Sequence, residues 1–154
     1  MGSTFCWFIW SCHFKLIYMK NYEHIIIWSA RILAAGILLQ TLFFKFTGAE
    51  ESKYIFSKLE AEPWGRIGSG VVELIASTLI LVPSTTWIGA LLGLGTMTGA
   101  IFAHLFVIGI SVRNSDGSQD KGQLFIYAVI VFIACTYLLW INKRSVPLLK
   151  NIVS

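Results

Sequence analysis

Several side chains that could do chemistry lie inside long apolar stretches of this sequence. In a bilayer each charge at mid-depth costs about 2.5–3.5 kcal/mol unless it is paired or reaches the interface, so such residues mark candidate sites. A carboxylate and an imidazole in a low-dielectric environment could exchange a proton near neutral pH, or hydrogen-bond a quinone-like or other polar small molecule. The residues are Arg31, Lys45, Glu73 and His104, with Gln40 and Thr41 beside them.

Depth along the expected helices places most of these groups in one layer. Glu73 follows Arg66 by seven residues, which is roughly 10 Å of helix, and His104 precedes Arg113 by nine residues, or roughly 13 Å. Gln40 lies at a similar depth in the first helix, with Lys45 about one turn nearer the surface. These side chains can therefore serve one another if they face inward.

The helical periodicity predicts that they do face inward. The helical stripe through Glu73 holds polar or small residues, namely Arg66, Ser69, Gly70, Ala76 and Ser77, whereas large residues such as Val71, Leu74 and Ile75 point elsewhere. His104 also lies on a stripe of polar or small residues, and its helix holds the spacings Gly89 to Gly93 and Gly95 to Gly99. In the first helix Arg31, Leu38 and Lys45 recur at intervals of seven, and Ala34, Ala35 and Thr41 lie between them on the same inward face. We therefore predict a buried cluster of Glu73 and His104, completed by Lys45 or Gln40.

A structural explanation of the same residues stays open. Glu73 and Lys45 would then form an ion pair, and His104 would bond a backbone carbonyl or a neighbour such as Thr96. Arg31 lies near the terminal side of the first helix, where its guanidinium is expected to reach lipid phosphates. Haem would need paired inward histidines, whereas His13 and His24 lie outside or at the edge of that helix, so neither haem nor a metal site is expected.

Composition decides the class of protein. Hydrophobic residues make up 56% of the 154 residues and charged residues only 13%, which is typical of a chain covered by lipid. The net charge is +4, but the twelve Lys and Arg are scattered and form no basic stripe, which argues against nucleic acid. The three cysteines, Cys6, Cys12 and Cys135, have no paired or metal-ligand spacing.

The apolar stretches predict an all-α fold, a bundle of four transmembrane helices at residues 24–46, 67–84, 86–111 and 123–142. Pro83 to Thr86 predict a tight hairpin between the second and third spans, and Thr47 and Gly48 end the first. Residues 48–64 alternate apolar and charged side chains, so they form either an interfacial amphipathic helix over the bundle mouth or a loop. The charged turn formers of residues 113–123 indicate a solvated loop.

The sequence also predicts the segments outside the four spans and the orientation of the termini. Residues 1–18 form a peripheral segment, and Met19 is a candidate alternative start; residues 19–142 form the membrane domain and residues 143–154 a basic tail. Four spans put both termini on one side, and Arg31 tips an otherwise even balance of Lys and Arg toward the cytoplasm.

The order of several short motifs resembles the DoxX-like family of four-helix membrane proteins. The motifs are Arg31 and Gly36, Lys45-Phe46-Thr47-Gly48, and Gly70-Val71-Val72-Glu73-Leu74, followed by a third helix rich in small residues, and they cover residues 28–142. The resemblance implies a compact bundle in the bacterial inner membrane with redox-associated roles, and it carries Arg31, Lys45 and Glu73 over as family positions. It does not extend to His104. The lack of paired cysteines argues against direct disulfide exchange.

Three classes of function follow from these residues and the resemblance. The first is an accessory subunit of a membrane redox or quinone-linked system, with quinone as the candidate cofactor and a redox protein as partner. The second is a non-enzymatic assembly or scaffold protein for another membrane protein, as in distant animal relatives. The third, a proton-coupled carrier, is weakest because four helices make a small transporter unless the chain forms a homo-oligomer. No nucleophile motif defines an enzyme.

Overall fold

The computed structural model describes residues 3–112 and 118–143, with side chains from Tyr22 onward. Its helices are α1 (Ser3–Thr47), α2 (Glu50–Lys58), α3 (Trp64–Leu81), α4 (Thr86–Ala103), the π-helical turn η1 (His104–Ile108) and α5 (Gln123–Ile141). Four segments are long and apolar enough to cross a membrane: Tyr22–Thr47, Trp64–Leu81, Thr86–Ile108 and Gln123–Ile141. The predicted all-α fold with four spanning helices is confirmed.

Some predicted boundaries differ from the observed ones for local reasons. The second span begins at Trp64, directly after Pro63, and ends at Leu81 because Val82 is already extended. The third ends at Ile108, since Gly109 adopts φ +93°, a left-handed conformation that stops the helix. Residues 3–18 are helical and continue α1, whereas residues 113–117 and most of the basic tail, 144–154, lie outside the described residues.

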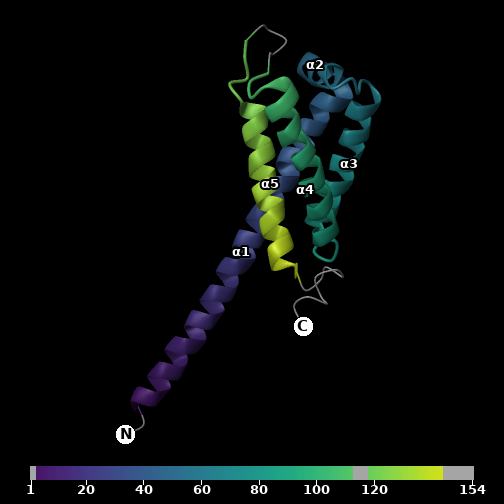
Figure 1. Ribbon diagram of the computed structural model, residues 1–154. Helices are drawn as coiled ribbons and strands as arrows, with labels where there is room; N and C mark the ends of the chain where they lie inside the picture. Colours follow the sequence, from purple (N-terminus) through teal and green to yellow (C-terminus); the bar gives the residue numbers. More distant parts are fainter. Residues whose placement is uncertain (1–2, 113–117, 144–154) are drawn as a thin grey trace.

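The four spanning helices form a ring in which α1 contacts α3, α3 contacts α4, α4 contacts α5, and α5 returns to α1. Figure 1 shows these helices side by side, with the first part of α1 extending past the bundle at the end where α5 finishes. The buried core contains small and branched residues from all four: Ala34, Ala35, Leu38, Ala76, Ile80, Ala90, Met97, Ala128, Val131, Ala134, Cys135 and Leu138.

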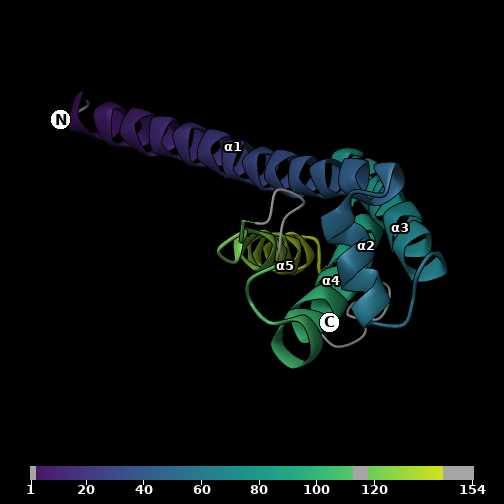
Figure 2. The same ribbon diagram turned by 90° about the horizontal axis from the view of Figure 1, so that it is seen from above.

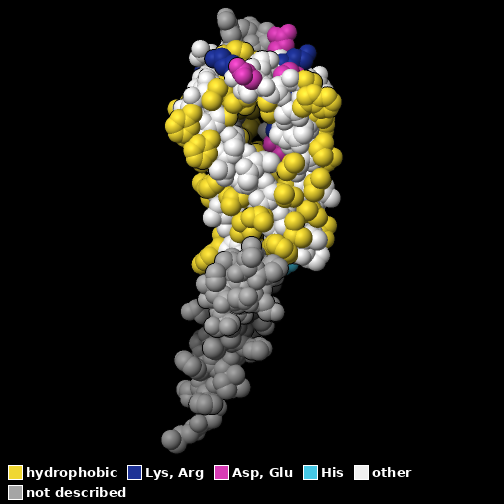
Figure 3. Space-filling view, turned by 45° about the vertical axis from the view of Figure 1, so that its right-hand side comes forward, with side chains coloured by type: hydrophobic (Ala, Val, Ile, Leu, Met, Phe, Trp, Pro, Cys, Tyr) yellow, Lys and Arg dark blue, Asp and Glu magenta, His cyan; other side chains and the backbone are white. Residues whose placement is uncertain are grey.

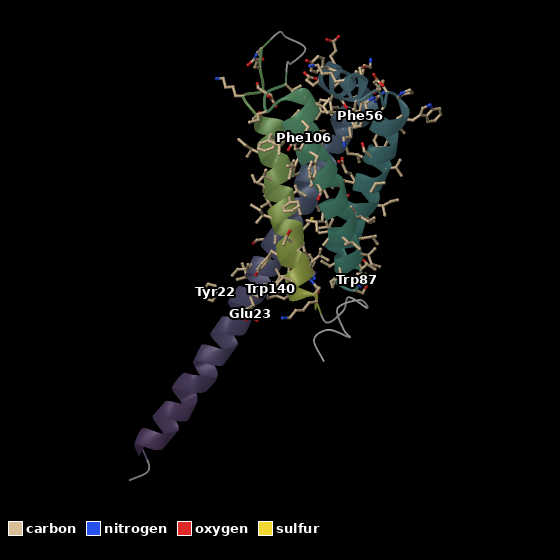
Figure 4. All side chains as sticks on the ribbon, in the orientation of Figure 1. Tyr22, Glu23, Phe56, Trp87, Phe106 and Trp140 are labelled. Atoms are coloured by element: carbon tan, nitrogen blue, oxygen red, sulfur yellow. The ribbon has the colours of Figure 1, made fainter. Side chains whose placement is uncertain are left out.

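Large apolar side chains point outward from the bundle, as expected of a protein whose solvent is lipid. Ile32, Phe43, Leu91 and Ile133 are all exposed. Aromatic residues gather at the ends: Figure 4 places Tyr22, Trp87 and Trp140 near one end and Phe56 at the other. This pattern is typical of membrane interfaces.

The short helix α2 lies across the end of the bundle opposite the α3–α4 hairpin, where it contacts α1, α3 and η1 (Figure 2). Of the two alternatives for residues 48–64, the helix is therefore correct. Gly48 makes the bend possible because its φ of +66° lies in the left-handed region. The helix ends with Lys58, and Leu59 donates its backbone N–H to the carbonyl of Ile55.

Candidate functional site

The predicted ion pair is present between α1 and α3. Lys45 Nζ lies 2.6 Å from Glu73 Oε1, and the hydroxyl of Thr41 donates to Glu73 Oε2 at 3.2 Å. The helices approach closely here because Gly70 faces α1: a Cβ built on Gly70 would lie 3.7 Å from Lys45 Cβ. Glu73 is 2% exposed, so the carboxylate and its ammonium partner are taken out of bulk solvent together.

Two further groups hold Lys45 in place. The ring of Phe56, from α2, lies 5.7 Å below the Lys45 ammonium, in range of a cation–π interaction. The Arg66 guanidinium donates to the backbone carbonyl of Lys45 and also to Glu62, with Nε 2.8 Å from Oε1. Cations placed at the last carbonyls of a helix are favourable, so Arg66 closes the C-terminal end of α1.

His104 faces the same interior from α4, at the start of the π-helical turn. It is 5% exposed, its Nδ1 lies 3.0 Å from the carbonyl oxygen of Gly109, and its ring meets Phe125 edge to face at 5.9 Å. A carbonyl can only accept, so Nδ1 is the donor, and in the neutral tautomer of the ring Nε2 is then an acceptor. Within the described residues no hydrogen bond joins His104 to Glu73.

These groups line one cavity of about 490 Å³ enclosed by the four spanning helices and α2. Figure 3 shows the hollow on one face of the bundle, with basic and acidic atoms visible inside it. The walls are mostly apolar, and the polar side chains are few enough to orient a ligand. Among the described residues the polar members are Gln40, Thr41, Lys45, Glu51, Ser52, Ser69, Glu73, Thr96, His104, Asp120, Gln123 and Tyr127.

The remaining predicted site residues are placed differently. Gln40 borders the cavity but is exposed. Arg31 lies outside the cavity, fourteen residues or about 21 Å along α1 from Lys45. Its guanidinium is 5.2 Å from the ring centroid of Trp28, and its buried Nε has no hydrogen-bond partner among the described residues. Thus Lys45, Glu73 and His104 share the cavity, whereas Arg31 does not.

Asp120 lines the cavity although the sequence places it in a charged loop. Its Oδ1 accepts from the backbone N–H groups of Val112, at 2.7 Å, and Gly122, at 3.0 Å, and its Oδ2 accepts from Leu124 at 3.2 Å. The signal in the sequence is an Asp two residues before a Gly that precedes a helix, a common turn arrangement. Asp120 therefore joins the end of η1 to the start of α5.

The ionised form of Asp120 should contribute to stability. Burial alone raises its pKa, but the backbone donors of Val112, Gly122 and Leu124 and the Ser111 hydroxyl outweigh burial, so the pKa lies below its ordinary 3.8. A folded-state pKa below the unfolded value stabilises the protein above that value, and the contribution is lost as pH falls through the folded pKa. Asp120→Asn should lower the free energy of unfolding by about 1 kcal/mol at pH 7.

Thermal unfolding in detergent between pH 3 and pH 7 measures this difference. The gap between wild type and Asp120→Asn should narrow toward pH 3, whereas Glu23→Gln, at an exposed carboxylate, should match the wild type at pH 7. A gap that stays constant over the whole range would show that the charge of Asp120 is not what holds the loop.

The described side chains contain neither a candidate metal site nor a disulfide. From Tyr22 to Val112 and from Ser118 to Lys143, no group of three His, Cys, Asp or Glu residues could hold a metal ion. Cys135 is buried as a free thiol, and the side chains of Cys6 and Cys12 are not among those described.

The four apolar spans define an integral multi-pass membrane protein, with a cavity between them that carries a few polar side chains. Comparison with known families then gives a more specific result. The family DoxX matches residues 26–105, which is just over half of the chain and includes Lys45, Glu73 and His104. The chain belongs to the DoxX family. No curated protein and no solved structure matches it.

Proposed function

We propose that this DoxX family protein is an accessory subunit of a membrane redox or quinone-linked system, and that its cavity binds a quinone-like small molecule. The observation that supports the proposal is the presence of Lys45, Glu73 and His104 on the walls of one cavity inside the membrane-spanning bundle. Its volume of about 490 Å³ lies in the ordinary range of ligand pockets.

The polar groups suit a ligand with both carbonyl and hydroxyl forms. An ammonium donates and has no acceptor, so Lys45 would bond a carbonyl oxygen of the oxidised form. The Nε2 acceptor of His104 would take a hydrogen bond from a hydroxyl of the reduced form. Glu73, which accepts hydrogen bonds from Lys45 and Thr41, would hold the Lys45 ammonium in its orientation.

Native mass spectrometry of the protein extracted in mild detergent tests the proposal. A small molecule should co-purify with the wild type and be lost from both Glu73→Gln and His104→Ala, because each variant removes a polar group from the cavity wall. Ser77→Ala is the matched control for Glu73: Ser77 is fully buried one turn further along α3, but it bonds only the carbonyl of Leu74 and does not line the cavity. His24→Ala is the control for His104.

The outcomes separate this role from an assembly role. A ligand that survives in the control variants and disappears from both cavity variants supports the proposal. If no ligand is found, and the cavity variants instead lose stability or a co-purifying membrane protein, the cluster is structural and the assembly role is the better explanation.

A further inference from the structure

The cavity has a side opening between α3 and α4, which bears on what kind of ligand it accepts. At the hairpin end the two helices touch: a Cβ built on Gly89 would lie 2.6 Å from the backbone nitrogen of Ile80. Further along α4, Gly95 and Gly99 have no atom within 4 Å of the corresponding position, and both are exposed. Figure 1 shows α3 and α4 separating from the hairpin toward the end covered by α2.

Gly95 and Gly99 also line the cavity, together with Ser69 on the facing side of α3. Glycine has no side chain that could reach from the cavity to the surface, so an exposed glycine that lines the cavity lies where the cavity meets the outside. We name this opening, flanked by Ser69, Gly95 and Gly99, the lateral portal. In the view of Figure 3 a hollow with charged atoms inside it lies on the face of the bundle, as an opening at this position would produce.

The lateral portal opens at the depth of the hydrocarbon core. Gly95 and Gly99 lie about 14 Å and about 20 Å from the start of the span Thr86–Ile108, which is itself about 33 Å long. What lies beside the opening at this depth is lipid tail, since water is excluded from the bilayer core. At the other end the cavity is covered by Ser52, Ile55 and Phe56 of α2 and by Leu59 directly after it.

Neither glycine is explained by the fold of the chain itself. Both have ordinary helical φ angles and open space at the Cβ position, whereas glycine inside a helix costs about 1 kcal/mol relative to alanine. The absence of side chains leaves a gap that a hydrocarbon chain can occupy. Charge also restricts the ligand, because the described lining residues include three carboxylates, Glu51, Glu73 and Asp120, and among these described residues the only ammonium is that of Lys45.

We propose that the ligand is a lipid with an uncharged polar head and a long hydrocarbon tail, the head lying at Lys45 and His104 and the tail leaving the bundle through the lateral portal. This inference rests on the proposed function and adds the class of ligand and its route. A phosphate head group would be repelled by the excess of carboxylates in the described lining. A water-soluble ligand would not reach an opening that faces lipid tails.

Blocking the lateral portal tests the inference. The Cβ of Gly99→Leu would have no described atom within 4 Å, so the protein should fold, and Gly68→Leu, at an exposed helical glycine of α3 outside the cavity, is the matched control. Two probes are compared in detergent by quenching of tryptophan fluorescence: a quinone with a long isoprenoid tail and tetramethylbenzoquinone, which has none. Gly99→Leu should weaken binding of the tailed quinone about tenfold or more, because the buried tail contacts are lost.

The tail-less quinone should bind Gly99→Leu and wild type within about twofold, and Gly68→Leu should bind both probes as the wild type does. Equal loss of both probes, or no loss of either, overturns the lateral portal while the binding site stands. Association of wild type into dimers that Gly99→Leu abolishes, with unchanged binding of both probes, also overturns it and assigns the glycines to a helix contact. If wild type binds neither probe, the proposed function itself fails.

Discussion

Replacing Lys45 by methionine is expected to lower the free energy of unfolding by about 3–5 kcal/mol, because it leaves Glu73 as a buried carboxylate without its ammonium partner. Glu73 is 2% exposed, and its other hydrogen bond comes from the uncharged hydroxyl of Thr41 at 3.2 Å, compared with 2.6 Å from Lys45. Denaturant unfolding of the purified protein in detergent measures the loss. Lys53→Met, at an exposed lysine of α2, should cost less than about 1 kcal/mol.

The double variant Lys45→Met with Glu73→Met separates the structural and the ligand explanations of this pair. Removing both charges of a buried ion pair often restores stability, so the double variant should recover most of what Lys45→Met loses. If the pair serves only the fold, this variant should behave as wild type in every assay. If the pair binds a ligand, it should be folded and unable to retain the co-purifying molecule. A Lys45→Met protein as stable as wild type would contradict the buried pair itself.

The sequence predicts the bundle and its inward faces well because both depend on periodic patterns. On α3, Arg66, Gly70, Glu73, Ala76 and Ser77 are buried as their stripe predicts, while Val71, Leu74 and Ile75 are exposed. In a membrane bundle, small and polar residues lie on the helix face toward the bundle interior, and large apolar residues lie on the face toward lipid. This pattern can be read from a single sequence. The same argument correctly places Ala34, Ala35 and Leu38 of α1 in the core.

The contacts within the site are less predictable. Depth and helical face predict which side chains lie in the same layer of the bundle, but they do not predict which of these side chains contact each other. The sequence left Lys45 and Gln40 as alternatives beside Glu73, and side-chain reach decides for Lys45. His104 bonds the carbonyl of Gly109 because α4 ends in a π-helical turn there, and the local sequence marks only the stop at Gly109. Asp120 is brought to the cavity by the return of the loop to α5, which no helical periodicity encodes.

Gly89→Ala is expected to lower the free energy of unfolding by about 1–3 kcal/mol, although alanine is the better helix former. The added methyl group would lie 2.6 Å from Ile80 N, 2.7 Å from Ala76 O and 2.9 Å from Leu79 C. All three atoms are backbone, so α3 and α4 must move apart as rigid helices, since no side chain can rotate away. Thermal unfolding in detergent measures the effect.

Gly68→Ala provides the contrast, because it adds the same methyl group to a helix where no atom lies within 4 Å. Its stability should equal or slightly exceed that of the wild type, and two equally stable variants would show that the α3–α4 contact at Gly89 is looser than the structure indicates. The comparison also concerns the cavity. The contact at Gly89 and the gap at Gly99 lie on one helix less than three turns apart, so tight packing at the hairpin end sets the angle at which α3 and α4 open around Glu73 and His104.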